Sequence, residues 1–238
     1  MRFYRGLKPV SAMTFDLDDT LYDNHPVIRA LEHQLKNWLE SRYPNLARFS
    51  GEDWFGFKQQ AINKQPELRH DVTKARTGQL FLAFKAIGLD CDATSQAITD
   101  TMQQVYVLRN QVTVPHSSLH TLQQLSNAMP LVAITNGNVD LQQIGIDGYF
   151  QHVLKAGESG RAKPFSDMFD KACTALELQP QQVLHVGDHL ISDVAGAKRA
   201  GLQAAWFNDK PRTLITASKL SLLPDIEINS IPELLDLI

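Results

Sequence analysis

The chain reads AMTFDLDDT from Ala12 to Thr20, so an apolar run leads directly into three closely spaced carboxylates. The run has no alternating polar face, which predicts a buried strand, and the acidic residues then lie where that strand ends. If a turn begins at Asp16, that residue presents its side chain and Asp18 presents its backbone carbonyl, and both reach one hard metal ion. The alternative is a solvated acidic turn that caps the following helix.

The composition is that of an ordinary globular protein. The 238 residues are 43% hydrophobic and 21% charged, with a formal net charge of −3. This charge predicts no general attraction to nucleic acid or to an anionic membrane surface, so a small anion would need a local binding site. No apolar run approaches the roughly 20 residues that span a bilayer, and none of signal-peptide length precedes Asp16. We therefore expect a cytoplasmic protein.

The two cysteines predict no covalent framework. Cys91 and Cys173 are far apart and lie outside any CxxC pattern, which argues against a disulfide scaffold and against a zinc knuckle. We expect both to be buried, reduced thiols.

Short apolar runs alternate with helical patterns along most of the chain. The runs span residues 12–15, 131–134, 153–156, 183–186 and 204–207, and the helical segments span 116–129, 165–178 and 193–200. Because the runs do not alternate with polar residues, each is interpreted as a buried strand. This alternation predicts an α/β fold with a doubly wound, Rossmann-like parallel sheet and right-handed crossovers. Ligands of such sheets bind outside the carboxyl ends of the strands, which is where the polar tips of these runs would lie.

The segment from 23 to 112 does not follow this alternation of strands and helices. It contains no convincing buried strand, and its apolar residues follow helical spacing in two stripes: Val27, Leu31, Leu35, Trp38 and Leu39, then Leu80, Phe81, Phe84 and Ile87. A usual βα connection is far shorter. We interpret residues 23–112 as an inserted small α-helical cap domain, and residues 1–22 and 113–238 as the α/β core domain. Helices that flank the sheet are the alternative.

Two further strand tips carry polar groups suited to an anion. Thr135, Asn136 and Gly137 offer a hydroxyl, an amide and a backbone that can approach a ligand closely, which suits phosphate oxygens. The same three residues are also good turn formers. Lys163, followed by Pro164, would add a compact positive charge.

The last tip reads GDHLISD, from Gly187 to Asp193. Gly187 ends the predicted strand and Asp188 stands at its carboxyl edge. Asp193 would begin a helix, where it caps that helix or turns back toward Lys163 or a metal-bound water. His189 is interpreted as shaping the entrance of the site, in preference to a catalytic base.

Together these stretches resemble the haloacid dehalogenase superfamily of phosphohydrolases. The resemblance rests on DLDDT at 16–20, TNG at 135–137, KP at 163–164 and GDHLISD at 187–193, in this order and at these strand ends. The helical segment between the first and second stretches is similar to the small helical cap of that superfamily.

The resemblance implies a role for each motif residue. Asp16 would be the nucleophile that forms an aspartyl phosphate, and Asp18 the general acid and then the general base. Mg²⁺ would be held by Asp16, Asp18 and Asp188. The remaining phosphate oxygens would be bound by Thr135, Asn136, Gly137 and Lys163, of which Lys163 is also expected to act in catalysis. Thr20 and Asp193 would orient these groups.

The implied reaction is hydrolysis of a small phosphate ester. Asp18 favours a phosphatase over a dehalogenase, because cleavage of a carbon–halogen bond needs neither magnesium nor an acid there. Four stretches, at 14–24, 70–73, 131–138 and 163–168, resemble bacterial phosphatases that act on flavin mononucleotide and on the phosphorylated ribitylaminouracil of riboflavin synthesis. The alternatives are a phosphatase for sugar phosphates or nucleotides, a phosphotransferase such as a mutase, and a non-catalytic metal-binding protein. We expect a monomer or a small homo-oligomer with no nucleic-acid or membrane partner.

Overall fold

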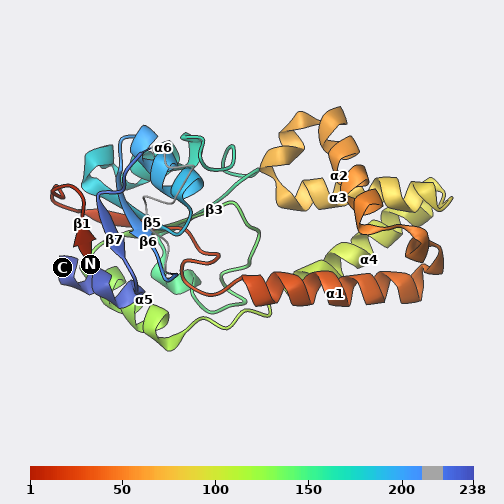
Figure 1. The fold of residues 1–238 in the computed structure, drawn as a ribbon, viewed down its shortest axis with the longest axis horizontal. Coiled ribbons are helices and arrows are strands. Elements are labelled where there is room, and N and C mark those ends of the chain that lie inside the picture. The colour runs from red at the N-terminus through yellow and green to blue at the C-terminus, as the bar shows by residue number, and fades with distance from the viewer. Residues whose placement is uncertain (211–221) are drawn as a thin grey trace. The chain divides into compact units, whose positions relative to one another are not determined.

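The computed structural model describes residues 1–210 and 222–238, and it folds into two compact units (Figure 1). The core unit contains residues 1–23, 113–137 and 141–238, and the helical unit contains residues 24–112 and 138–140. The chain passes from the core unit to the helical unit after residue 23, one residue later than the sequence predicted. The short excursion at 138–140 has no counterpart in that expectation.

The core unit is built on one seven-stranded sheet. Its strands are β1 (Arg2–Phe3), β2 (Ala12–Phe15), β3 (Leu131–Thr135), β4 (His152–Lys155), β5 (Val183–Gly187), β6 (Gln203–Phe207) and β7 (Ile226–Ile228). They lie in the order β1-β7-β6-β5-β2-β3-β4, and every pair is parallel except β1 with β7. The predicted doubly wound α/β fold is confirmed, and a strand forms at each of the five predicted runs. The expected burial of the run at 153–156 was wrong, because β4 is the edge strand of the sheet and its residues are exposed or half-buried. β1 and β7 were not predicted.

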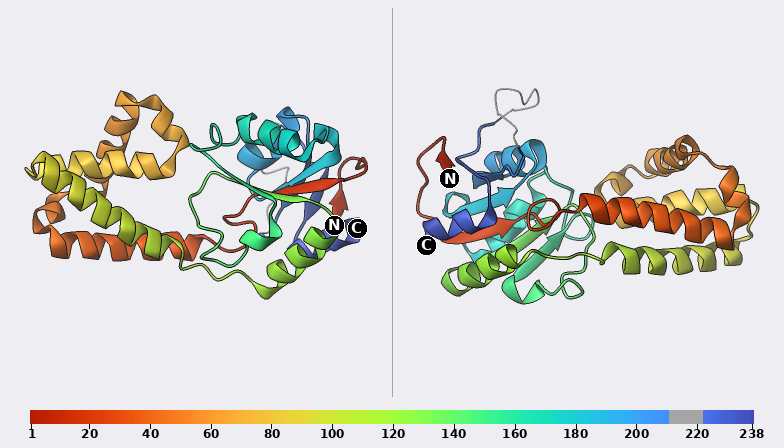
Figure 2. Two further views of the ribbon diagram at one scale, coloured as in Figure 1. Left: turned by 180° about the vertical axis from the view of Figure 1, so that it is seen from behind. Right: turned by 60° about the horizontal axis from the view of Figure 1, so that its bottom comes forward.

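Helices pack on both faces of the sheet (Figures 1 and 2). They are α5 (His116–Ala128), α6 (Asp167–Leu176) and α7 (Gly196–Arg199), with a π-helical turn η5 (Leu190–Ala195) and the 3-10 turns η3 (Asp147–Tyr149), η4 (Pro180–Gln182) and η6 (Ile231–Leu237). On one face, Met168 and Phe169 of α6 pack with Val132 and Ile134 of β3 and with Trp206 of β6. These side chains are fully buried, so the strand ends are held in a rigid frame.

Residues 24–112 and 138–140, which form the helical unit, contain helices and turns but no strand. Its elements are α1 (His25–Arg42), η1 (Pro44–Arg48), α2 (Gly51–Lys64), η2 (Pro66–His70), α3 (Val72–Ala86) and α4 (Cys91–Arg109). Ser50, Asp71 and Asp90 accept a hydrogen bond from the first turn of α2, α3 and α4, which explains where these helices begin.

Two apolar clusters lie in the interior of this unit, and the larger one includes Leu31, Leu35 and Leu39 from the first predicted stripe. Leu80 and Phe84 of the second stripe join it, but Phe81 is 47% exposed. The second stripe is therefore narrower than its spacing indicated.

Two local expectations were wrong. Cys91 is exposed because it is the first residue of α4, and only Cys173 is buried. The helix expected to begin at Asp193 starts earlier, at Leu190. In the part of the chain that the structure describes, we find no helix with the length and apolar character needed to cross a membrane.

Candidate active site

The candidate site lies in the core unit, at the carboxyl edge of three adjacent strands. β2 is flanked by β5 and β3, and Phe15 at its end pairs with Val186 on one side and Ala133 on the other. The residues that follow these strands consequently emerge at the same edge of the sheet. This arrangement brings the predicted acidic, TNG and GDHLISD stretches together.

Lys163 occupies the centre of the site. Its ammonium lies 2.6 Å from Asp16 Oδ1, 2.7 Å from Asp193 Oδ1 and 2.7 Å from the carbonyl oxygen of Ile134. The side chain is only 1% exposed. An ammonium group has three protons to donate, so these three acceptors satisfy it completely.

The charges of this cluster influence one another strongly. Burial works against the charged form of Lys163, but Asp16 and Asp193 outweigh it and raise the pKa of the ammonium. Burial raises the pKa of Asp16 to about 7, although Lys163 acts in the opposite direction. For Asp193, Lys163 and His185 outweigh burial and hold the pKa below its usual range. Lys163 is therefore charged at neutral pH and Asp193 is its permanent counter-ion.

A tight turn after β2 aims the acidic side chains. Thr20 Oγ1 donates to Asp16 Oδ2 (3.2 Å) and accepts from the backbone N–H of Asp188 (3.2 Å), so it links the two stretches. The turn is closed by Asp19, whose left-handed backbone (φ 61°) lets its N–H reach the carbonyl of Tyr22 (2.9 Å).

From the sequence, Tyr22 was only one of several unranked candidates for substrate contact, and the structure places it against Asp18. Its hydroxyl donates to Asp18 Oδ1 at 2.7 Å, and the Tyr22 residue is buried. A four-residue separation across a turn is the signal that could have suggested this pair. The hydrogen bond orients the side chain expected to act as an acid and a base.

The TNG stretch makes contacts that differ in part from the expectation. The side-chain amide of Asn136 donates to the backbone carbonyl of Lys163 (3.0 Å) and its oxygen accepts from the Lys163 N–H (2.8 Å). The Gly137 N–H, expected to bind phosphate, donates to Thr135 Oγ1 at 2.9 Å. Asn136 therefore fixes the backbone of Lys163, and the loop forms a compact turn of its own.

Asp193 does not cap the helix, so that alternative is wrong. The cap is His189, whose Nδ1 accepts from the N–H groups of Ile191 (3.3 Å) and Ser192 (3.1 Å). Asp193 lies inside η5 and accepts from the His189 N–H through Oδ2 (2.9 Å). His185 is a residue that sequence reasoning missed. Its Nε2 lies 3.4 Å from Asp193 Oδ1.

Carboxylates gather where a cation would be held. Oxygen atoms of Asp16, Asp188 and Asp193 all lie within 4.8 Å of one another. The Asp188 backbone is held by Trp206, whose indole N–H donates to its carbonyl (2.9 Å). The side chain of Asp18 is outside this cluster, which fits its expected contribution through the backbone alone. An all-oxygen donor set suits a hard cation such as Mg²⁺.

This combination of fold and site is matched by a known family. Residues 10–201 match the model of the haloacid dehalogenase-like hydrolases, and the chain belongs to that family. Among its relatives is the 5-amino-6-(5-phospho-D-ribitylamino)uracil phosphatase YigB of Escherichia coli, 41% identical over 238 residues and 100% of both chains. The mouse N-acylneuraminate-9-phosphatase is 27% identical over 96% of this chain and 94% of its own. The expected class of enzyme, a phosphatase, is thereby confirmed.

Solved structures agree on the fold. A crystal structure described as a 2-haloacid dehalogenase from Pseudomonas syringae superposes with a TM-score of 0.90 and 32% identity, over 96% of this chain and 97% of its own. The L-2-haloacid dehalogenase of Xanthobacter autotrophicus has a TM-score of 0.61 at 21% identity, over 96% and 98%. The second likeness supports the fold alone.

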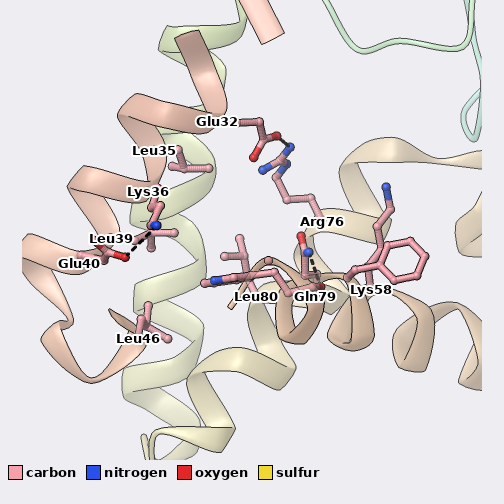
Figure 3. A pocket seen from close by; sticks show the side chains of 13 residues that line it. Glu32, Leu35, Lys36, Leu39, Glu40, Leu46, Lys58, Arg76, Gln79 and Leu80 are labelled. Atoms are coloured by element: carbon pink, nitrogen blue, oxygen red, sulfur yellow. Dashed lines mark hydrogen bonds and ion pairs between the residues drawn. The ribbon is translucent and has the colours of Figure 1, made fainter. Parts of the chain in front are cut away.

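A separate pocket of about 400 Å³ lies within the helical unit (Figure 3). Leu35, Leu39 and Leu80 contribute apolar surface to it, and Glu32 and Arg76 form an ion pair in its lining. None of the predicted site residues lines this pocket. It is therefore distinct from the cluster around Lys163.

We predict that Gly187→Ala destabilises the site. A Cβ atom at this position would lie 2.5 Å from the Cβ and Cγ of Asp193, closer than real side chains approach, so Asp193 would have to leave Lys163. Such overpacking costs about 1–3 kcal/mol of unfolding free energy, measurable by urea denaturation. Gly148→Ala is the control, because a Cβ there meets nothing within 4 Å. Equal stability of the two variants would contradict the argument.

Proposed function

We propose that this chain is a magnesium-dependent phosphomonoester hydrolase that acts through an aspartyl phosphate on Asp16. The observation that carries the proposal is the pair of contacts that aim this carboxylate: Lys163 on Oδ1 and Thr20 on Oδ2. Both hold a side chain that is 10% exposed, at the end of β2. A carboxylate fixed in this way is prepared for in-line attack on phosphorus.

The reaction has two steps. A carboxylate oxygen of Asp16 attacks phosphorus, the bond from phosphorus to the ester oxygen breaks, and Asp18 gives its proton to the leaving alkoxide. Asp18, now ionised, takes a proton from water. The resulting hydroxide attacks phosphorus, the bond from phosphorus to Asp16 breaks, and both aspartates return to their initial forms.

Side chains of the core unit stabilise the charges of these steps. Lys163 places a buried positive charge beside the attacking carboxylate, where charge interacts more strongly than in water. The Thr135 hydroxyl and the backbone of Asn136 and Gly137 lie at the neighbouring strand end and would bind phosphate oxygens. For Gly137, the bond to Thr135 must then be exchanged for one to the ligand.

The acidic residues fit a bound magnesium ion. Asp16 and Asp188 would hold it through their side chains and Asp18 through its backbone carbonyl. Such an ion would supply positive charge that offsets the phosphoryl oxygens and favours the ionised form of Asp16. Asp193 would remain on Lys163, since its two oxygens already accept hydrogen bonds.

For the substrate, we propose 5-amino-6-(5-phospho-D-ribitylamino)uracil, flavin mononucleotide or both. The support is the full-length 41% identity to the Escherichia coli phosphatase named for the first of these compounds. We further propose that the helical unit is a cap that contributes to substrate selection. Other small phosphate esters form the second candidate class, because the mouse relative is named for a phosphorylated sugar acid.

Asp16→Asn is predicted to abolish turnover, because an amide cannot form the acyl phosphate. Release of phosphate from p-nitrophenyl phosphate should fall by about 10³-fold or more. Circular dichroism should show the fold intact. Asp19→Asn, the same change three residues along at a left-handed position that Asn tolerates, is the control. Substantial turnover by Asp16→Asn would rule out this nucleophile.

Metal removal is predicted to stop the reaction reversibly. Dialysis against EDTA should reduce phosphate release by about 10²-fold or more, and added Mg²⁺ should restore it, because carboxylates and phosphate repel each other without a cation. Undiminished activity in EDTA would contradict the metal assignment. A protein that binds Mg²⁺ but releases no phosphate under any condition would support the non-catalytic alternative.

A substrate panel tests the proposed specificity. We expect kcat/KM for the ribitylaminouracil ester or flavin mononucleotide to exceed that for sugar phosphates by about tenfold, a difference of about 1.4 kcal/mol in transition-state binding. A 2-haloacid serves as the comparison suggested by the Pseudomonas syringae structure, and we expect no halide release. A strong preference for sugar phosphates would reject the riboflavin-pathway substrate and leave the phosphatase class unchanged.

A further inference from the structure

A short segment of the chain connects the TNG loop to the helical unit. Residues 138–140 belong by their packing to the helical unit, while residues 137 and 141 belong to the core unit. The excursion begins directly after Gly137, the last residue of the loop proposed to bind phosphate. Its central residue, Val139, is fully buried.

Polar contacts hold this segment from both ends. Asn138 Oδ1 accepts from Arg109 Nε (3.3 Å), and its amide nitrogen donates to Thr73 Oγ1 (3.1 Å). At the other end, the Asp140 N–H donates to Asn110 Oδ1 (2.8 Å) and Asp140 Oδ2 accepts from the Tyr106 hydroxyl (2.6 Å).

These partners are themselves well anchored. Arg109 and Asn110 lie at the end of α4, and Thr73 is in the first turn of α3. The Arg109 residue is only 3% exposed, which is rare for a guanidinium and requires polar partners that cannot easily be replaced. The position of Asn138 is consequently set by the ends of two helices.

We infer that Arg109 and Asn138 are positioning residues for the phosphate-binding loop. Asn138 is bonded covalently to Gly137, whose N–H contacts Thr135, so fixing its side chain restricts the backbone of the loop. This role rests on the proposed function, in which Thr135 and Gly137 bind the phosphoryl group. Neither Arg109 nor Asn138 needs to contact the substrate. Their contribution is to reduce the conformational freedom that the loop loses on binding phosphate.

A purely structural role is the competing explanation. Loss of a buried arginine would then lower the stability of the helical unit and leave phosphate affinity unchanged. The affinity of the folded protein for inorganic phosphate separates the two explanations, because it requires neither turnover nor an identified substrate.

The experiment compares Asn138→Ala, Arg109→Gln and the double variant with wild type, in Mg²⁺ and well below the unfolding temperature. Isothermal titration calorimetry with inorganic phosphate gives Kd, and p-nitrophenyl phosphate gives kcat and KM. Each single variant should weaken phosphate binding by about tenfold, the size expected for a hydrogen bond to a charged group. The Kd of the double variant should be about that of the more weakly binding single variant, because both substitutions remove the same hydrogen bond between Arg109 and Asn138.

Phe84→Leu is the matched control. It loosens the helical unit in its apolar cluster, where Phe84 is fully buried, and should lower the unfolding temperature without changing Kd for phosphate. If Arg109→Gln fails to fold, Asn138→Ala and Thr73→Val carry the test, since Thr73 is exposed and its hydroxyl accepts the hydrogen bond from Asn138.

The outcomes distinguish this inference from the proposed function. The positioning role is overturned if the single variants bind phosphate with the wild-type Kd. It is also overturned if the fold increase in Kd of the double variant equals the product of the two single increases. Wild-type protein that binds inorganic phosphate but releases none from esters overturns the proposed function, and the comparison of Kd values still decides the positioning role. Wild-type protein that binds no phosphate overturns both.

Discussion

The site depends on one buried positive charge. Removing an ammonium from water costs several kcal/mol, and that cost is met only where enough acceptors surround it. The acceptors of Lys163 come from three places: Asp16 after β2, Ile134 near the end of β3, and Asp193 beyond β5. A single side chain thus ties together the carboxyl edges of three neighbouring strands. The loss of any one acceptor would leave a buried charge incompletely satisfied.

The same cluster gives its two carboxylates different properties. Asp193 is 2% exposed, contacts both Lys163 and His185, and has its pKa held below the usual range. Asp16 contacts the same ammonium, yet burial raises its pKa to about 7. One carboxylate therefore neutralises the lysine permanently, and the other remains sensitive to what binds beside it. Two groups of one type acquire separate roles through their environments.

Much of the fold follows from local patterns. The strands β2 to β6 coincide with short, mainly apolar runs, and the segment between β2 and β3 shows the 3.6-residue spacing of helices, so the sequence indicated both. The strands β1 and β7 have only two and three residues, too few to establish any periodicity. Phe81 fits the apolar spacing of α3 but is exposed. Helical spacing indicates which residues share one face of a helix. How many of them are buried depends on the packing of neighbouring elements against that face.

By itself, the sequence determined the types of chemical group present and the strand ends where they occur, because both are encoded in short, contiguous stretches. Only the tertiary structure decided which groups meet. Asp16 and Lys163 are 147 positions apart, and Asn136 reaches the Lys163 backbone across 27. Only the structure showed that His189 caps the helix and that Asp193 lies inside η5 and contacts Lys163. Periodicity and turn chemistry act over a few residues, whereas partners in a buried network are selected by distance in space.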